Sequence, residues 1–525
     1  MKVRPPRRKG AAGKKMPLRH ESRPDAYGAA GKKTPLRHES RPDDCGAAGD
    51  QIENTPFLQR ERSGREKGRV RMLTTNTDFL YGELMDVLRL FGAELPDVAH
   101  YFVHDGYKFA NSVIVGGREY DFTEEMPWRG ELEFKRYAKR FSKLALYKAL
   151  RAETGKEMPW GALTGIRPTK LAYAEREAGR DFFPLFKKFC VSRENAELVA
   201  DVLSSQEGIY AKEEGTADLY VGIPFCPSKC NYCSFITADI GRTGKYIGGY
   251  LDALEKELDA VRGIRRLKSV YIGGGTPLVL DAEALERVLR AVAPHIAAGV
   301  EYTVEAGRPD VFTDEKLALL KAHGVTRICV NPQTFSDATL VRIGRKHTAA
   351  DIYKAFAMAE KCGFDINCDL IAGLTGESLA EFKDSIDRAI ALSPANITVH
   401  SLCLKKGAKL KEEESLLFVA DIEKMIAYSR EKLYAAGYKP YYLYRQKYMA
   451  GNSENTGWTK AGKACVYNVD VMEEIADNIA CGANAVSKRV FFAEGRIERI
   501  GSPKDIPTYI DKIDAIAEEK RKFFA

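Results

Sequence analysis

Three cysteines lie close together in the segment GIPFCPSKCNYCSF, at Cys226, Cys230 and Cys233. The segment follows a strand-like run, and three thiols at this spacing in a turn can point at one small volume. A structural zinc site takes four ligands, usually as two separated pairs, and a thioredoxin-like redox motif takes two thiols. Three thiolates leave one position of a cluster open for a substrate. The spacing therefore predicts a catalytic iron–sulfur cluster, with a zinc site or a chance grouping as the alternative.

Further residues with chemical potential follow the strand-like runs downstream. Gly273, Gly274 and Gly275 end the second run and precede Thr276, and their lack of side chains lets backbone groups approach a ligand closely. This loop is not a nucleotide phosphate loop, because no Gly-Lys-Ser/Thr follows. The other candidates at or just after strand ends are Glu305, Gln333, Arg345, Asp369 and Cys403.

The cysteine segment resembles the signature of the radical S-adenosylmethionine (SAM) superfamily. The flanking YVGIPFC is similar to the oxygen-independent coproporphyrinogen III oxidase branch, which also contains haem chaperones. The resemblance implies a [4Fe–4S] cluster on Cys226, Cys230 and Cys233, with SAM chelated by the remaining iron and cleaved to a 5′-deoxyadenosyl radical. It further implies SAM contacts at Tyr220, Tyr232, Gly274, Gly275, Thr276, Glu305, Gln333, Arg345, Asp369 and Cys403.

The chemistry of SAM suits the residue types in this set. SAM is a zwitterion with a ribose diol, and Arg345 can clamp its carboxylate with two hydrogen bonds. Glu305, Gln333 and Asp369 can accept hydrogen bonds from its ammonium group and hydroxyls. The tyrosines and the aliphatic strand ends can enclose the adenine ring.

Two positions depart from the decarboxylating enzymes of this branch. Gly222 stands where those enzymes carry the His of YxHIPFC, and Phe235 stands where they carry a further Cys. Three ligands suffice for the cluster, whereas loss of the His removes a group that would contact the substrate or move a proton. The chain is most similar to a divergent group of the branch that has an N-terminal extension.

The resemblance implies a radical SAM oxidoreductase of porphyrin and haem biosynthesis. Its reaction would be oxidative decarboxylation of coproporphyrinogen III propionates towards protoporphyrinogen IX, with reducing power from a flavodoxin- or ferredoxin-type donor. The alternative is a haem-binding chaperone that retains the cluster without decarboxylase activity. Gly222 favours this alternative.

The elements that must position these residues are six strand-like runs alternating with helical patterns between residues 216 and 405. Such alternation requires parallel strands with right-handed crossovers, and the site then lies at the carboxyl ends of the strands. The prediction is an α/β fold built on a partial (β/α)6 parallel barrel of the radical SAM type, with a small N-terminal α+β and helical region and a C-terminal α+β extension.

The flanking regions divide by pattern. Residues 72–125 predict a small α+β domain, and residues 126–215 predict a helical connecting region. Residues 406–525 are interpreted as a domain that contacts the substrate or forms a lid. There Tyr444, Arg445, Gln446 and Lys447 form an aromatic and cationic cluster, which either recognises a flat carboxylated substrate or packs against the barrel.

Charge and composition locate the remaining features of the 525-residue chain. Residues 1–71 hold 19 Lys and Arg against 9 Asp and Glu, while the other 454 residues hold 62 against 64. The basic tail contains an 18-residue repeat beginning at Ala11 and Ala29, with almost nothing to bury, and we expect it to be disordered. A nucleic-acid or membrane-surface arm is the less favoured interpretation.

Two further properties concern the cellular setting. Eleven Cys scattered over a long chain do not form a disulfide pattern, and the N-terminus lacks the apolar run of a secretory signal. The sequence contains no uninterrupted run of about 18 apolar residues, so it predicts no membrane span. The sequence therefore predicts a cytoplasmic protein.

Overall fold

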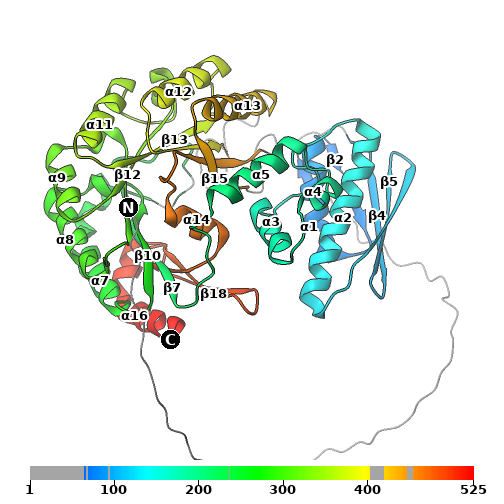
Figure 1. The fold of residues 1–525 in the computed structure, drawn as a ribbon, viewed down its shortest axis with the longest axis horizontal. Coiled ribbons are helices and arrows are strands. Elements are labelled where there is room, and N and C mark those ends of the chain that lie inside the picture. Colours follow the sequence, from blue (N-terminus) through cyan, green and yellow to red (C-terminus); the bar gives the residue numbers. More distant parts are fainter. Residues whose placement is uncertain are drawn as a thin grey trace, which may run out of the picture. The chain divides into compact units, whose positions relative to one another are not determined.

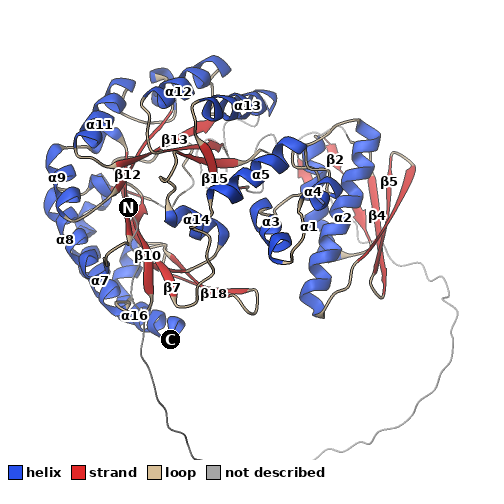
Figure 2. Ribbon diagram, in the orientation of Figure 1, coloured by secondary structure: helices blue, strands red, loops and turns tan. Residues whose placement is uncertain are grey.

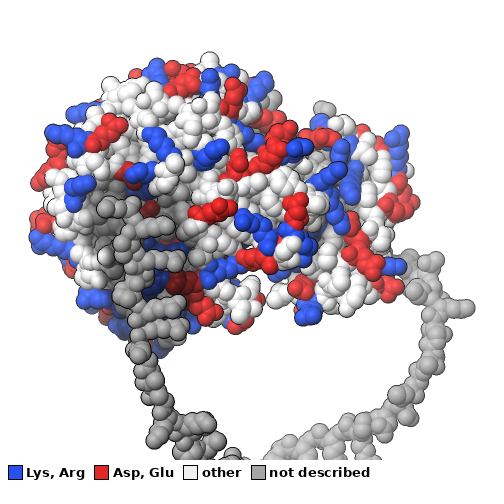
Figure 3. Space-filling view, viewed as in Figure 1, with Lys and Arg blue, Asp and Glu red and all other residues white. Residues whose placement is uncertain are grey.

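The computed structural model describes residues 64–66, 69–71, 73–92, 95–233, 235, 237–402, 419–445 and 453–525. Figures 1 and 2 show the arrangement of the helices and strands. Among the described residues, no helix is long and apolar enough to cross a membrane. Acidic and basic side chains are intermixed over the face in Figure 3, as the near-neutral charge of residues 72–525 predicts.

The N-terminal region contains a four-stranded sheet in the order β3-β4-β5-β6, in which β3 is parallel to β4 and the other pairs are antiparallel. Alternating apolar residues bury one face of this sheet against helices, as in Phe109, Val113 and Val115. The elements of this region are β3 (Leu73–Thr75), α1 (Asp78–Leu88), β4 (Val98–Asp105), β5 (Lys108–Val115) and β6 (Arg118–Glu125).

The segment after this sheet is helical. Its first helix packs on the sheet and ends at Gly155, whose positive φ of 67° completes a left-handed cap. The helices are α2 (Gly130–Thr154), α3 (Pro168–Glu177), α4 (Phe183–Lys188) and α5 (Arg193–Ser205).

The main sheet has eleven strands in the order β15-β16-β14-β13-β12-β11-β10-β7-β17-β18-β19. Its centre is the predicted series of six parallel strands, whose nearly continuous burial is typical of a sheet covered on both faces. These strands are β7 (Thr216–Ile223), β10 (Arg266–Gly274), β11 (Glu301–Gly307), β12 (Arg327–Gln333), β13 (Asp365–Ala372) and β14 (Asn396–Ser401).

Helices between the strands form an outer layer around the curved sheet, which confirms the partial (β/α)6 barrel (Figure 1). Several begin with side-chain caps, and Thr348 and Ser378 each form a complete capping box. The helices are α6 (Ile240–Thr243), α7 (Ile247–Ala260), α8 (Ala282–Val292), α9 (Asp314–Ala322), α10 (Asp337–Arg342), α11 (Ala349–Lys361), α12 (Leu379–Ala391) and α13 (Val419–Ala435).

The C-terminal region extends the main sheet at both edges. One edge gains antiparallel β16 beside β14, and the other gains β17, which is parallel to β7. The elements are β15 (Lys439–Tyr444), β16 (Asn455–Thr459), α14 (Val466–Glu473), β17 (Asp477–Cys481), β18 (Val486–Phe491), β19 (Arg496–Gly501), α15 (Ile506–Asp511) and α16 (Ile513–Phe524).

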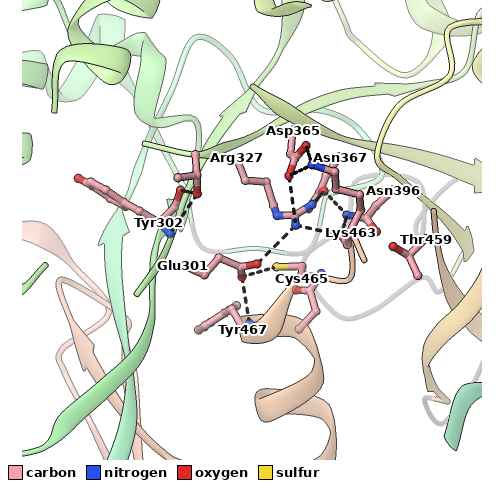
Figure 4. A network of polar contacts seen from close by, with 12 residues as sticks. Glu301, Tyr302, Arg327, Asp365, Asn367, Asn396, Thr459, Lys463, Cys465 and Tyr467 are labelled. Carbon is pink, nitrogen blue, oxygen red and sulfur yellow. Dashed lines mark hydrogen bonds and ion pairs between the residues drawn. The ribbon is translucent and has the colours of Figure 1, made fainter. Parts of the chain in front are cut away.

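Helix α14 and the loop before it close the amino-terminal end of the barrel (Figure 4). The Glu301 carboxylate, at the start of β11, accepts hydrogen bonds from the Cys465 thiol and the Tyr467 amide. Arg327, at the start of β12, donates to the Lys463 carbonyl at 2.9 Å and to the side chain of Asn367. This part of the C-terminal region is thus a floor at the end of the barrel opposite the carboxyl ends of the strands.

The predicted tail boundary at residue 71 falls within described secondary structure. Strands β1 (Gly64–Glu66) and β2 (Arg69–Arg71) pair antiparallel. The repeat and the rest of the tail lie outside the described residues.

Replacing Arg327 tests the floor. The Arg327 side chain is 5% exposed and forms an ion pair with Glu301 at 3.4 Å, so Arg327→Met leaves a buried carboxylate without its cation. We expect a loss of about 3–5 kcal/mol in the free energy of unfolding, measured by denaturant titration. The matched control is Lys463→Met, since the Lys463 side chain is 47% exposed where it pairs with Asp365 and should contribute about 1 kcal/mol or less. Equal effects of the two changes would contradict the assignment.

Candidate active site

The carboxyl ends of the parallel strands surround a cavity of about 320 Å³. A volume of this size is at the lower end of the range for small-molecule sites. Its described lining is Cys226, Ser228, Cys230, Tyr232, Cys233, Phe235, Thr237, Gly274, Gly275, Thr276, Glu305, Gly307, Arg308, Asn331, Gln333, Arg345, Asp369, Ile371, His400, Ser401, Leu402, Tyr444 and Asn455.

The loop that carries the three cysteines (the cysteine loop, residues 223–233) is joined by backbone hydrogen bonds to the segment at the end of β10 (the glycine loop, residues 273–276). The Gly275 amide donates to the Ile223 carbonyl at 2.7 Å, and the Thr276 amide donates to the Phe225 carbonyl at 2.8 Å. A Cβ atom on Gly275 would lie 2.4 Å from the Phe225 carbonyl oxygen and 2.9 Å from Cys226 Sγ. Only glycine therefore allows this approach, which holds the first thiol against the ligand-facing backbone.

The three predicted ligand cysteines line the same cavity. Burial raises the pKa of the Cys226 and Cys233 thiols, and the neighbouring cysteines raise both further. Among the described residues, no three His, Cys, Asp or Glu side chains are grouped as ligands of a single metal ion. In a [4Fe–4S] site each thiolate binds a different iron atom, so the ligands do not converge on one point.

Contacts from two other strand ends hold the cysteine loop. Arg308, after β11, donates to Ser228 Oγ at 2.7 Å and is itself held by both carboxylate oxygens of Asp310. The Asn231 amide donates to the Ile343 carbonyl. The loop between the cysteines is therefore fixed by β11 and by the segment after α10.

Arg345 is a buried cation that faces the cavity. It donates to the Tyr232 hydroxyl at 2.9 Å and to the Asn331 carbonyl, while its Nε atom has no partner among the described residues. Asn331 Oδ1 and Gln333 Oε1 are likewise buried without a described partner, and Gln333 adopts a left-handed φ of 72°. Unpaired buried polar atoms and backbone strain at one cavity are typical of a ligand site.

Two carboxylates, those of Glu305 and Asp369, also line the cavity. Glu305 accepts hydrogen bonds from the Tyr271 hydroxyl at 3.0 Å and from the Gly274 amide at 3.3 Å. Burial, together with the negative charge of Asp369, raises the pKa of Glu305 to about 7. A bound cation would reverse this shift by favouring the carboxylate.

Most residues predicted as SAM contacts meet in this cavity. Tyr232, Gly274, Gly275, Thr276, Glu305, Gln333, Arg345 and Asp369 all line it. Tyr220 does not line it, since its ring lies inside the barrel in a stack with Tyr271 and Tyr467. Cys403 lies outside the described residues.

The described members of the aromatic and cationic cluster, Tyr444 and Arg445, have different surroundings: one lies at the cavity and the other packs against the helical region. Tyr444 lines the cavity, whereas Arg445 donates to the Leu163 carbonyl and lies over the Trp160 ring, 5.1 Å from its centroid. Arg445 is thus a packing residue between β15 and the helical region. Gln446 and Lys447 lie outside the described residues.

Sequence reasoning missed several cavity residues. Arg308 follows a glycine in an otherwise ordinary run, and His400 lies inside the strand-like run NITVHSL, where a histidine has no spacing signal. Asn455 comes from antiparallel β16, whose pairing with β14 no local pattern indicates. Their proximity to the cysteines depends on the order of strands in the sheet.

Gly222 has a packing role in this structure. Its carbonyl accepts a hydrogen bond from the Tyr250 hydroxyl, and a Cβ atom there would lie 3.3 Å from the Tyr220 ring and from the Cys481 carbonyl oxygen. The space that a larger side chain would need is filled by Tyr220 and by β17.

Comparison with known proteins defines the class. The Radical SAM superfamily model matches residues 220–389. The chain is 34% identical over 398 residues to the oxygen-independent coproporphyrinogen-III oxidase-like protein HemZ of Bacillus subtilis, covering 71% of this chain and 78% of that protein. It is also 38% identical over 189 residues to the heme chaperone HemW of Lactococcus lactis, covering 35% of this chain and 49% of that protein.

A solved structure, that of coproporphyrinogen III oxidase HemN from Escherichia coli, aligns with a TM-score of 0.47 and 20% identity, covering 62% of this chain and 73% of that one. The chain belongs to the radical SAM superfamily. Within it, the chain belongs to the family of oxygen-independent coproporphyrinogen-III oxidase-like proteins.

The cofactors of this superfamily are a [4Fe–4S] cluster and SAM, and the cavity suits both. Three cysteine sulfurs stand beside a glycine loop that a Cβ atom would obstruct. Beside the cysteine loop, the unpaired polar atoms of Asn331, Gln333 and Arg345 suit the amino acid end of SAM.

The Gly275→Ala change tests the close approach of the two loops. The added methyl must displace the Phe225 carbonyl or the Cys226 thiol, so we expect iron content after anaerobic reconstitution to fall several-fold and stability to fall by about 1–3 kcal/mol. Gly248→Ala is the control, because a Cβ atom there meets no atom within 4 Å on α7. A full iron complement in Gly275→Ala would show that the loops need not touch.

The pH dependence of SAM binding tests Glu305. With its pKa raised to about 7, this group stabilises the ligand-free fold at low pH, and that contribution is lost as the pH rises through 7. If Glu305 pairs with the SAM ammonium group, binding requires the carboxylate, and affinity should fall about tenfold per pH unit below that value. Equilibrium dialysis from pH 6 to 8 should show that Glu305→Gln removes this component. If the ratio of the wild-type SAM affinity to the Glu305→Gln affinity stays constant from pH 6 to 8, Glu305 is not the group that titrates.

Proposed function

We propose that this protein oxidatively decarboxylates propionate side chains of coproporphyrinogen III towards protoporphyrinogen IX. The observation that carries the proposal is the single cavity shared by the three cysteines, the glycine loop, Arg345 and Glu305. The relative that spans most of the chain, named as a coproporphyrinogen-III oxidase-like protein, supports the choice of substrate class.

The chemistry follows from what each group holds in place. When bound beside the three cysteines, the cluster and SAM would together supply the radical chemistry that takes a hydrogen atom from the propionate carbon next to the pyrrole ring. The carbon–carbon bond to the carboxylate then breaks, carbon dioxide leaves, and one electron passes to a one-electron acceptor as the vinyl group forms. Arg345 would hold the SAM carboxylate and Glu305 its ammonium group, which fixes the position of the reacting carbon.

The protein must also exclude water from this chemistry. The floor formed by α14 seals the amino end of the barrel, and the Tyr220, Tyr271 and Tyr467 rings fill the interior below the cavity. Access is therefore from the strand-end side, where a flat macrocycle would approach.

The partner and setting follow from the same chemistry. The cluster must be reduced at the low end of the range for iron–sulfur proteins, which requires a donor of the flavodoxin or ferredoxin type. The nine described cysteines are free thiols, which fits a reducing cytoplasmic setting.

A haem chaperone is the second candidate. The relatives named heme chaperone HemW favour it, and so does Gly222, which leaves no histidine at that position. Such a carrier would retain the cluster and pass haem to an acceptor protein without producing vinyl groups.

Turnover under anaerobic conditions separates the two. Reconstituted protein would receive coproporphyrinogen III, SAM, dithionite and a one-electron acceptor, and both 5′-deoxyadenosine and vinyl product would be quantified. We expect both to form with the wild type and neither with Cys230→Ala, which lacks a cluster ligand. Formation of 5′-deoxyadenosine without vinyl product, together with tight haem binding, would favour the chaperone.

A further inference from the structure

His400 differs from the other described histidines in its position. It lies near the carboxyl end of β14 and is the one histidine among the described residues that line the cavity. Its side chain is 28% exposed, with Nδ1 3.3 Å from the Tyr444 hydroxyl and Nε2 3.8 Å from an Asp369 carboxylate oxygen. The Nε2 atom is thus close enough to Asp369 for electrostatic attraction but too far for a hydrogen bond.

The positive charges at the cavity are otherwise committed. Among the described lining residues, only Arg308, Arg345 and His400 can carry a positive charge. Arg308 is held by Asp310 and the cysteine loop, and Arg345 faces the expected position of the SAM carboxylate. A second bound anion therefore has His400 as its available cationic partner within this lining.

We infer that His400 is a substrate-contacting residue that binds a carboxylate of the tetrapyrrole side chains through Nε2–H. This inference rests on the proposed function, because it assigns the group that recognises the propionates of that substrate. Tyr444 orients the ring by accepting from Nδ1–H. The assignment explains how the cavity binds an acidic substrate without the histidine that Gly222 replaces.

The test compares binding of coproporphyrin III with binding of its tetramethyl ester, which has the same ring and no carboxylates. Porphyrin fluorescence is titrated with cluster-loaded protein in the presence of SAM. His400→Asn should weaken binding of the free acid about tenfold or more and leave ester binding unchanged, because one charge-assisted hydrogen bond is lost. His400→Arg, which keeps a cation, should bind the acid more tightly than His400→Asn.

His323→Asn is the matched control, since His323 ends α9 outside the cavity lining and should leave both affinities unchanged. Iron content and SAM affinity should be the same in all four proteins. In turnover, His400→Asn should raise KM for coproporphyrinogen III with little change in kcat.

Three results would overturn the inference: unchanged acid binding in His400→Asn, equal weakening of acid and ester, or loss of SAM affinity in parallel. Haem binding that depends on His400 while coproporphyrin III binding does not would instead make His400 an iron ligand and also overturn it. If the wild type makes no vinyl product yet binds the free acid through His400, the proposed reaction fails and the carboxylate contact stands.

Discussion

The contact between the cysteine loop and the glycine loop is the constraint on which the site depends. Two backbone hydrogen bonds join Gly275 and Thr276 to the chain that leads into Cys226, at a separation that a single methyl group would prevent. Because β7 and β10 are neighbours in register, the first thiol and the ligand-facing backbone are placed by the sheet itself. The other cavity groups then follow from the parallel order of the remaining strands.

The two ends of the barrel carry different sets of buried polar groups. At the carboxyl ends, polar atoms such as Gln333 Oε1 and Arg345 Nε are buried without described partners, as a site prepared for ligands requires. At the amino ends, Arg327 forms an ion pair with Glu301 and donates to the Lys463 carbonyl (Figure 4), while its Nε atom is buried without a described partner.

The sequence predicted the parts of the site that have local signals. The spacing of Cys226, Cys230 and Cys233 and the run of glycines before Thr276 are continuous motifs, and each lies at the cavity as expected. The alternation of strand and helix patterns predicted the six parallel strands for the same reason. The resemblance implies a SAM contact at Tyr220, and the structure places its ring in a stack with Tyr271 inside the barrel.

What the sequence could not predict depends on long-range pairing. The C-terminal strands join both edges of the main sheet, and α14 enters the opposite end of the barrel from the site. Cys465 is fully buried against Glu301 because the loop before α14 enters the barrel, and burial raises its thiol pKa. His400 reaches the cavity for a similar reason, because only the position of β14 in the sheet brings it beside Asp369.

Electron paramagnetic resonance of the anaerobically reduced protein, recorded before and after addition of SAM, tests the central claim most directly. The account predicts the signal of a reduced [4Fe–4S] cluster whose g values change when SAM binds, because three cysteines leave one iron open to the ligand. A colourless protein carrying zinc on these cysteines, or a cluster signal that SAM does not alter, would contradict it.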